Sequence, residues 1–135
     1  MDIQLNLKEF RHLLDLVYIG NWILNSVRGT DRFEDYDLIQ EKFFTLASQH
    51  GLPELAQSYM GHIFPSRAYE EGGIHDAIAD YEDAVFFDIL AEELARRDMT
   101  EEHLNPEDLK ELTARMDNYM SEFEANGIEN VNLDI

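Results

Sequence analysis

The chain has 135 residues, 44% hydrophobic and 29% charged, and its 29 acidic residues against 10 Lys and Arg give a formal net charge of −19. This apolar content excludes a fully disordered chain, even at such a net charge. The absence of cysteine excludes a disulfide scaffold, a thiolate zinc site and a cysteine nucleophile. Because neither an internal repeat nor a low-complexity linker divides the sequence, we expect a single helical domain over residues 1–135.

The acidic balance also limits the classes of partner. Nucleic acids and anionic membrane surfaces attract basic patches, so we expect the protein to bind neither. No run approaches the ~20 apolar residues of a membrane-spanning helix. The first residues, Met1–Gln4, lack the basic-then-apolar order of a secretory signal. We therefore expect a cytoplasmic protein.

Glycine and proline punctuate the chain between segments of helical periodicity. These segments predict an all-α bundle of about five helices, at approximately residues 7–28, 35–50, 53–61, 74–98 and 106–126. Asn6 with Glu9 has the spacing of a capping box, and Asn105 followed by Pro106 is typical of a helix start. Gly51 stands where a glycine commonly ends a helix.

The first predicted helix is apolar over most of its circumference. This pattern is typical of a central helix or of one buried between subunits, and so much apolar surface is hard to bury in a five-helix monomer. We therefore expect a homodimer that forms through this helix. Gly20 lies inside it, and we expect this glycine to let another helix approach closely beside Tyr18 and Trp22.

The two ends of the chain show a period of two instead. Apolar residues alternate with polar ones over residues 3–7 and again over residues 131–135, a pattern that predicts short extended segments. Two interpretations stay open. The ends are loose, or they pair as a small β ribbon within one chain or between two chains, supported by helices beneath it.

Charge is distributed unevenly along the chain. Residues 1–68 have a net charge of −3, whereas residues 69–135 have a net charge of −16. The acidic second half is a solvated face, a surface for a basic protein partner or a cation-binding face. If the acids repel one another in the folded state, the melting temperature rises with added salt and again on acidification toward about pH 5.5.

No recognised catalytic, nucleotide-binding or metal-binding motif occurs, so candidate chemistry is limited to the long connection before the fourth predicted helix. Carboxylates and imidazoles are ligands for divalent metals, and the same groups act in acid–base catalysis. The candidate catalytic residues are Arg67, Glu71 and His75, and the candidate metal ligands are Glu70, Glu71, His75 and Asp76. Acids also stabilise helix N-termini, which explains the same cluster without any metal.

Two hypotheses for function follow. The first is a small acidic helical binding or regulatory protein that acts by protein–protein contact and needs no cofactor. The alternative is a helical enzyme with a carboxylate and histidine site near residues 67–76, in which a divalent metal assists hydrolysis. A bound metal on that connection would favour the enzyme.

Overall fold

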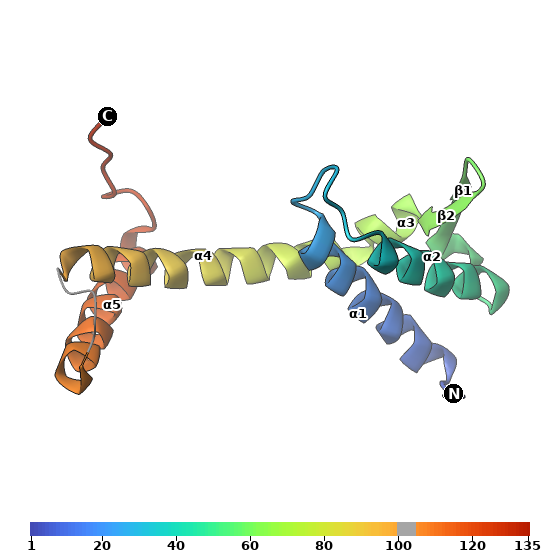
Figure 1. Ribbon diagram of the computed structural model, residues 1–135, viewed down its shortest axis with the longest axis horizontal. Helices are drawn as coiled ribbons and strands as arrows, with labels where there is room; N and C mark the ends of the chain where they lie inside the picture. The colour runs from blue at the N-terminus through green and yellow to red at the C-terminus, as the bar shows by residue number, and fades with distance from the viewer. Residues whose placement is uncertain (100–104) are drawn as a thin grey trace. The chain divides into compact units, whose positions relative to one another are not determined.

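The computed structural model describes residues 1–99 and 105–135, and these residues are mostly helical (Figure 1). The four longer helices are α1 (Leu7–Asn25), α2 (Glu34–Gln49), α4 (His75–Asp98) and α5 (Pro106–Asn126). Between α2 and α4 lie a 3-10 turn (Pro53–Leu55), strands β1 (Ala56–Tyr59) and β2 (His62–Pro65), α3 (Arg67–Tyr69) and a π-helical turn (Glu70–Ile74). Among the described residues, no helix has both the length and the apolar character that a membrane crossing requires.

The chain divides into two compact units, Met1–Ile78 and Ala79–Ile135, and the boundary falls inside α4. The first unit contains α1, α2, the two strands and α3. The second contains the rest of α4 together with α5. The expectation of a single domain over residues 1–135 stays a prediction.

Local capping explains where α1 and α5 begin. In α1 the Asn6 side chain accepts a hydrogen bond from the Glu9 amide at 2.8 Å, and the Glu9 carboxylate accepts one from the Asn6 amide at 2.9 Å. Asn105 and Asp108 form the same reciprocal pair at the start of α5. Such a pair satisfies backbone donors that the helix itself leaves free. Both predicted helix starts are therefore confirmed.

The predicted helix over residues 53–61 is wrong. Only Pro53–Leu55 turns, and β1 then pairs antiparallel with β2, so that Gln57 lies opposite Phe64. Met60 and Gly61 both have positive φ, at 49° and 79°, as a two-residue hairpin turn requires. The segment is too short for periodicity to separate a helix from a hairpin, and the choice depends on contacts with α2.

Three smaller expectations also change. α1 ends at Asn25 instead of residue 28, because the Asn25 side chain bonds the Phe33 backbone and turns the chain toward α2. Residues 1–6 and 131–135, each taken within its own unit, form no strand. A Cβ atom added at Gly20 would have no described neighbour within 4 Å. Among the residues that the structure describes, the expected close approach to Gly20 is therefore absent.

The core of the first unit is an aromatic cluster with aliphatic side chains around it. The Phe44 and Tyr69 rings meet edge to face with centroids 4.9 Å apart, and the Tyr18 and Tyr69 rings do so at 5.1 Å. This geometry suits the ring quadrupoles. The buried hydrophobic residues of the cluster are Leu14, Tyr18, Phe44, Ala47, Leu55, Tyr69, Ile74 and Ile78.

The second unit has a thinner core. Among its described residues, the buried hydrophobic ones are Ala91 and Ala95 on α4 and Leu112 and Phe123 on α5. The Phe87 and Phe123 rings lie 5.3 Å apart, and the Tyr119 hydroxyl donates a hydrogen bond to Asp98. The contact between α4 and α5 therefore buries fewer large hydrophobic side chains than the core of the first unit does.

Candidate functional site

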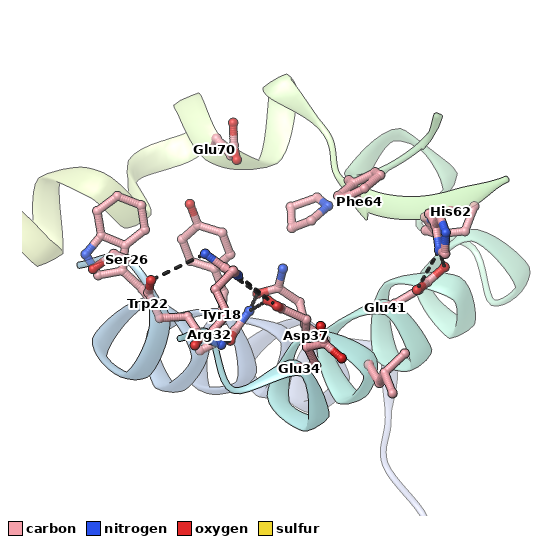
Figure 2. A pocket seen from close by; sticks show the side chains of 16 residues that line it. Tyr18, Trp22, Ser26, Arg32, Glu34, Asp37, Glu41, His62, Phe64 and Glu70 are labelled. Atoms are coloured by element: carbon pink, nitrogen blue, oxygen red, sulfur yellow. Dashed lines mark hydrogen bonds and ion pairs between the residues drawn. The ribbon is translucent and has the colours of Figure 1, made fainter. Parts of the chain in front are cut away.

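A groove of about 610 Å³ opens in the first unit between α1, α2 and β2 (Figure 2). Its aromatic side chains come from distant parts of the sequence: Tyr18 and Trp22 lie on α1, and Phe64 lies on β2. In Figure 2 the Tyr18 ring rises from α1 toward the turn that carries Glu70. Leu38, Ile63 and Pro65 add apolar lining. The groove therefore has an apolar, largely aromatic wall.

The floor of the groove is a buried network of amides. Asn25, only 1% exposed, donates from Nδ2 to Asn21 Oδ1 at 2.7 Å and to the Phe33 carbonyl at 3.1 Å, and its Oδ1 accepts from the Phe33 amide at 2.8 Å. Asn21 Nδ2 in turn donates to Asp37 Oδ1 at 3.0 Å. Because every buried polar group here has a partner, the network fixes α1 against the start of α2.

Arg32 completes this network from the connection between α1 and α2. Its Nε and Nη2 donate to the two carboxylate oxygens of Asp37 at 3.0 and 2.8 Å, a bidentate pair. The Arg32 guanidinium, and next the Asn21 amide, hold the pKa of Asp37 below its usual value against the opposing effect of burial. Asp37 and Arg32 therefore neutralise each other inside the groove.

A second carboxylate of the groove is held by the hairpin. Glu41 Oε1 accepts a hydrogen bond from the Ile63 amide at 3.0 Å and lies 3.2 Å from His62 Nδ1. The bond from the Ile63 amide is the main cause that lowers the pKa of Glu41, and His62 adds to it. This contact joins α2 to β2 across one end of the groove, as Figure 2 shows.

Two further carboxylates line the groove without a charge partner. Neither Glu34 nor Glu70 makes an ion pair or a side-chain hydrogen bond with any residue that the structure describes. Burial raises the pKa of Tyr18 to about 12, with the negative charge of Glu70 as the second cause. Glu70 thus places an uncompensated negative charge close to the aromatic wall.

The sequence-predicted site residues lie around a separate, shallow hollow. Glu70, Glu71, His75 and Asp76 line this hollow of about 400 Å³ together with Gly73. One of its carboxylates is already paired with a cation. Glu71 pairs with Arg67, whose Nε donates to it at 2.6 Å, and no cluster of three or more His, Asp or Glu side chains suited to a metal ion occurs within residues 1–99 and 105–135.

His75 is positioned by the aromatic wall. Its Nε2 forms a hydrogen bond of 2.7 Å with the Tyr18 hydroxyl, and its ring meets the Trp22 ring edge to face at 4.8 Å. The imidazole thereby links the start of α4 to α1. The catalytic and metal-binding assignments for Arg67, Glu70, Glu71, His75 and Asp76 stay predictions, and the described geometry adds no support for them.

Sequence reasoning missed the groove and its polar floor. A signal was present, because Leu14, Tyr18, Asn21 and Asn25 follow the helical spacing that puts them on one face of α1. Two asparagines in phase with core residues indicate a buried amide network. Comparisons with protein-family models, curated proteins and solved structures gave no match.

Proposed function

We propose that this protein is a small acidic binding protein that acts by protein–protein contact, and that the aromatic groove of its first unit holds a basic segment of the partner. One observation carries the proposal. Tyr18, Trp22 and Phe64 line the same groove as Glu34 and Glu70, whose carboxylates have no charge partner among the described residues. An aromatic wall beside free carboxylates suits a Lys or Arg side chain.

Lys and Arg side chains suit this groove because each has a charged end group and an aliphatic stem. A guanidinium or ammonium over an aromatic face gains about 0.5–2 kcal/mol, depending on how far it loses water. Its aliphatic stem packs against apolar groups while its charge reaches a carboxylate. Arg28 already uses this chemistry within the chain, since its guanidinium carbon lies 4.2 Å from the centre of the Phe33 ring.

Size and charge support a protein segment as the ligand. A groove of about 610 Å³ falls within the range of roughly 300–1,000 Å³ typical of ligand sites, and it accommodates one or two long side chains with their backbone. The net charge of −19 steers a basic partner toward the protein. Residues 69–135 carry −16 of this net charge.

Trp22 allows a direct test, because it is the one tryptophan of the chain and lines the groove. We would titrate the protein with capped Arg-Gly, Lys-Gly and Glu-Gly octapeptides at ~0.15 M salt, where long-range attraction is screened, and follow tryptophan emission. We expect a saturable change with the basic peptides and none with the acidic one. Absence of any saturable change with the basic peptides would overturn the proposal.

A matched pair of double variants separates the groove from general charge attraction. Glu34→Gln with Glu70→Gln removes the two free carboxylates of the groove, whereas Asp35→Asn with Glu54→Gln removes two exposed carboxylates of the same unit outside it. We expect the first variant to bind the basic peptides at least tenfold more weakly and the second to change little. Equal weakening in both would contradict the groove as the site.

A further inference from the structure

The two aromatic side chains that α1 contributes to the groove form one platform, defined here as the rings of Tyr18 and Trp22. The two rings are nearly parallel, with an interplanar angle of 24° and centroids 6.2 Å apart. Residues four apart lie on the same face of a helix, and Figure 2 shows the two rings side by side. The groove therefore presents two flat π surfaces in nearly one orientation.

The platform is held in place by its neighbours. The His75 imidazole meets both rings at an interplanar angle of 82°, with its centroid 5.6 Å from that of Tyr18 and 4.8 Å from that of Trp22. His75 Nε2 also forms a hydrogen bond of 2.7 Å with the Tyr18 hydroxyl, and Tyr69 packs edge to face against Tyr18. Because the rings are fixed before a ligand arrives, binding orders few additional side chains.

A carboxylate without a partner among the described residues lies close to the platform. Glu70 lines the groove together with Tyr18 and Trp22. Its backbone amide donates to the Ser66 carbonyl at 3.0 Å, which fixes the turn that carries it. Burial is the main cause that raises the pKa of Tyr18, and the charge of Glu70 is the second. A cation on the platform therefore lies within the field of this carboxylate.

We propose that the groove selects arginine over lysine, with the guanidinium stacked on the platform and paired with Glu70. The inference rests on the proposed function, because it names the side chain of the basic segment that the groove holds. A guanidinium is planar, so it stacks flat on an aromatic ring, and it is more weakly hydrated than an ammonium. Its parallel N–H groups also match the two oxygens of a carboxylate. An ammonium is compact and strongly hydrated, and it has neither advantage.

Charge alone does not separate the two side chains, since each carries a single positive charge at neutral pH. The preference therefore depends on the shape of the end group and on its loss of water. The first unit already contains one such contact, because the guanidinium carbon of Arg11 lies 4.9 Å from the centre of the Tyr69 ring. Within the groove, Asp37 binds the guanidinium of Arg32 through two hydrogen bonds, so the charge of Arg32 is neutralised before a ligand arrives.

Three peptides of equal length separate shape from charge. We would compare capped Arg-Gly, Lys-Gly and citrulline-Gly octapeptides by Trp22 emission at ~0.15 M salt. Lysine keeps the charge without the planar group, and citrulline keeps a planar group without the charge. We expect the Arg-Gly peptide to bind about tenfold more tightly than each of the others.

The outcomes distinguish this inference from the proposed function. Binding of Lys-Gly as tight as that of Arg-Gly would overturn the preference for arginine and leave the proposed function intact. Binding of citrulline-Gly as tight as that of Arg-Gly would overturn the pairing with Glu70. Absence of binding by both basic peptides would overturn the inference and the proposed function together.

Two variants of Trp22 test the platform itself. Trp22→Leu keeps apolar bulk without a π surface, whereas Trp22→Phe keeps an aromatic ring. Calorimetry replaces emission here, because both variants lack the one tryptophan of the chain, and melting curves establish that both are folded. We expect the ratio of Arg-Gly to Lys-Gly affinity to fall about threefold in Trp22→Leu and to persist in Trp22→Phe. An unchanged ratio in a folded Trp22→Leu would contradict stacking on the platform.

Glu70→Gln and Glu71→Gln form a matched pair for the carboxylate. Both residues are exposed, and each variant removes one negative charge, but Glu71 pairs with Arg67 and lines the separate hollow instead of the groove. We expect Glu70→Gln to weaken the binding of Arg-Gly about fivefold and to lower its advantage over Lys-Gly. Glu71→Gln should leave both unchanged. Equal effects in the two variants would assign the loss to net charge and overturn the inference.

Discussion

The two units of the chain are stabilised in different ways. The first gathers eight buried hydrophobic residues from several elements around an aromatic cluster and adds a satisfied amide network. The second buries Ala91, Ala95, Leu112 and Phe123 between two helices and carries 17 acidic residues against four basic ones. The first therefore has the rigid surroundings that a binding groove needs, whereas the second combines a small buried core with a high density of negative charge.

The largest expected effect is on the core of the first unit. Phe44 is fully buried against Tyr69, and Phe44→Ala should lower the free energy of unfolding of that unit by about 3–5 kcal/mol, because it leaves a cavity. Hydrogen exchange resolved by segment would measure it, since each unit is followed separately. Phe123→Ala should act mainly on the second unit. Equal loss of protection in both units from either variant would show that they unfold together.

The amide network comes next. Asn25→Ala leaves the Phe33 amide and the Asn21 Oδ1 atom without the partner that Asn25 supplies, and it removes one hydrogen bond to the Phe33 carbonyl. We therefore expect a loss of about 1–3 kcal/mol in the first unit. Asn126→Ala, which removes an exposed amide at the end of α5, is the control and should change stability little. Chemical denaturation measures both. A neutral Asn25→Ala would mean that water replaces the amide.

A smaller effect depends on pH. Asp37 has a lowered pKa, mainly through Arg32, so its contribution is present above the unfolded pKa of about 4 and is lost as the pH falls through the lower folded value. Asp37→Asn should be less stable than the unmodified chain at pH 7 by about 1 kcal/mol or less, since the pair is partly exposed. This difference should vanish in acid. A difference that persists unchanged at pH 2 would contradict the ion pair.

The same sign applies to the other carboxylates whose pKa is lowered. Hydrogen bonds lower the pKa of Asp31, Glu41, Asp98 and Glu122. Protonation of these groups lowers the stability of the folded state, whereas protonation of carboxylates crowded by like charge would raise it. The rise in melting temperature on acidification toward about pH 5.5 stays a prediction, and these four groups oppose it.

The smallest effect is that of salt. Screening at ~0.15 M shortens the range of charge repulsion to about 8 Å, so sodium chloride should stabilise the second unit by a few tenths of a kcal/mol and the first unit less. Segment-resolved hydrogen exchange at two salt concentrations compares them. If both units respond equally, charge does not explain the difference between them.

Sequence alone determined the features that depend on neighbours one helical turn away. The capping box of Asn6 with Glu9 and the cap at Asn105 occur as predicted, and α5 has the predicted bounds of residues 106–126. α2 and α4 begin within one residue of their predicted starts. These outcomes are predictable because the interactions that decide them lie within three or four residues.

The tertiary structure decided everything that depends on distant residues. It converted residues 56–65 into a hairpin through the contact between Glu41 and Ile63, and it turned His75 toward Tyr18, 57 positions earlier in the chain. The apolar composition of α1 was evident from the sequence, but packing alone selected which side of this helix lies in the core and which carries Leu16 and Ile23. A helix that is apolar all round offers several faces of similar burial energy. Only the shape and polarity of its neighbours decide among them.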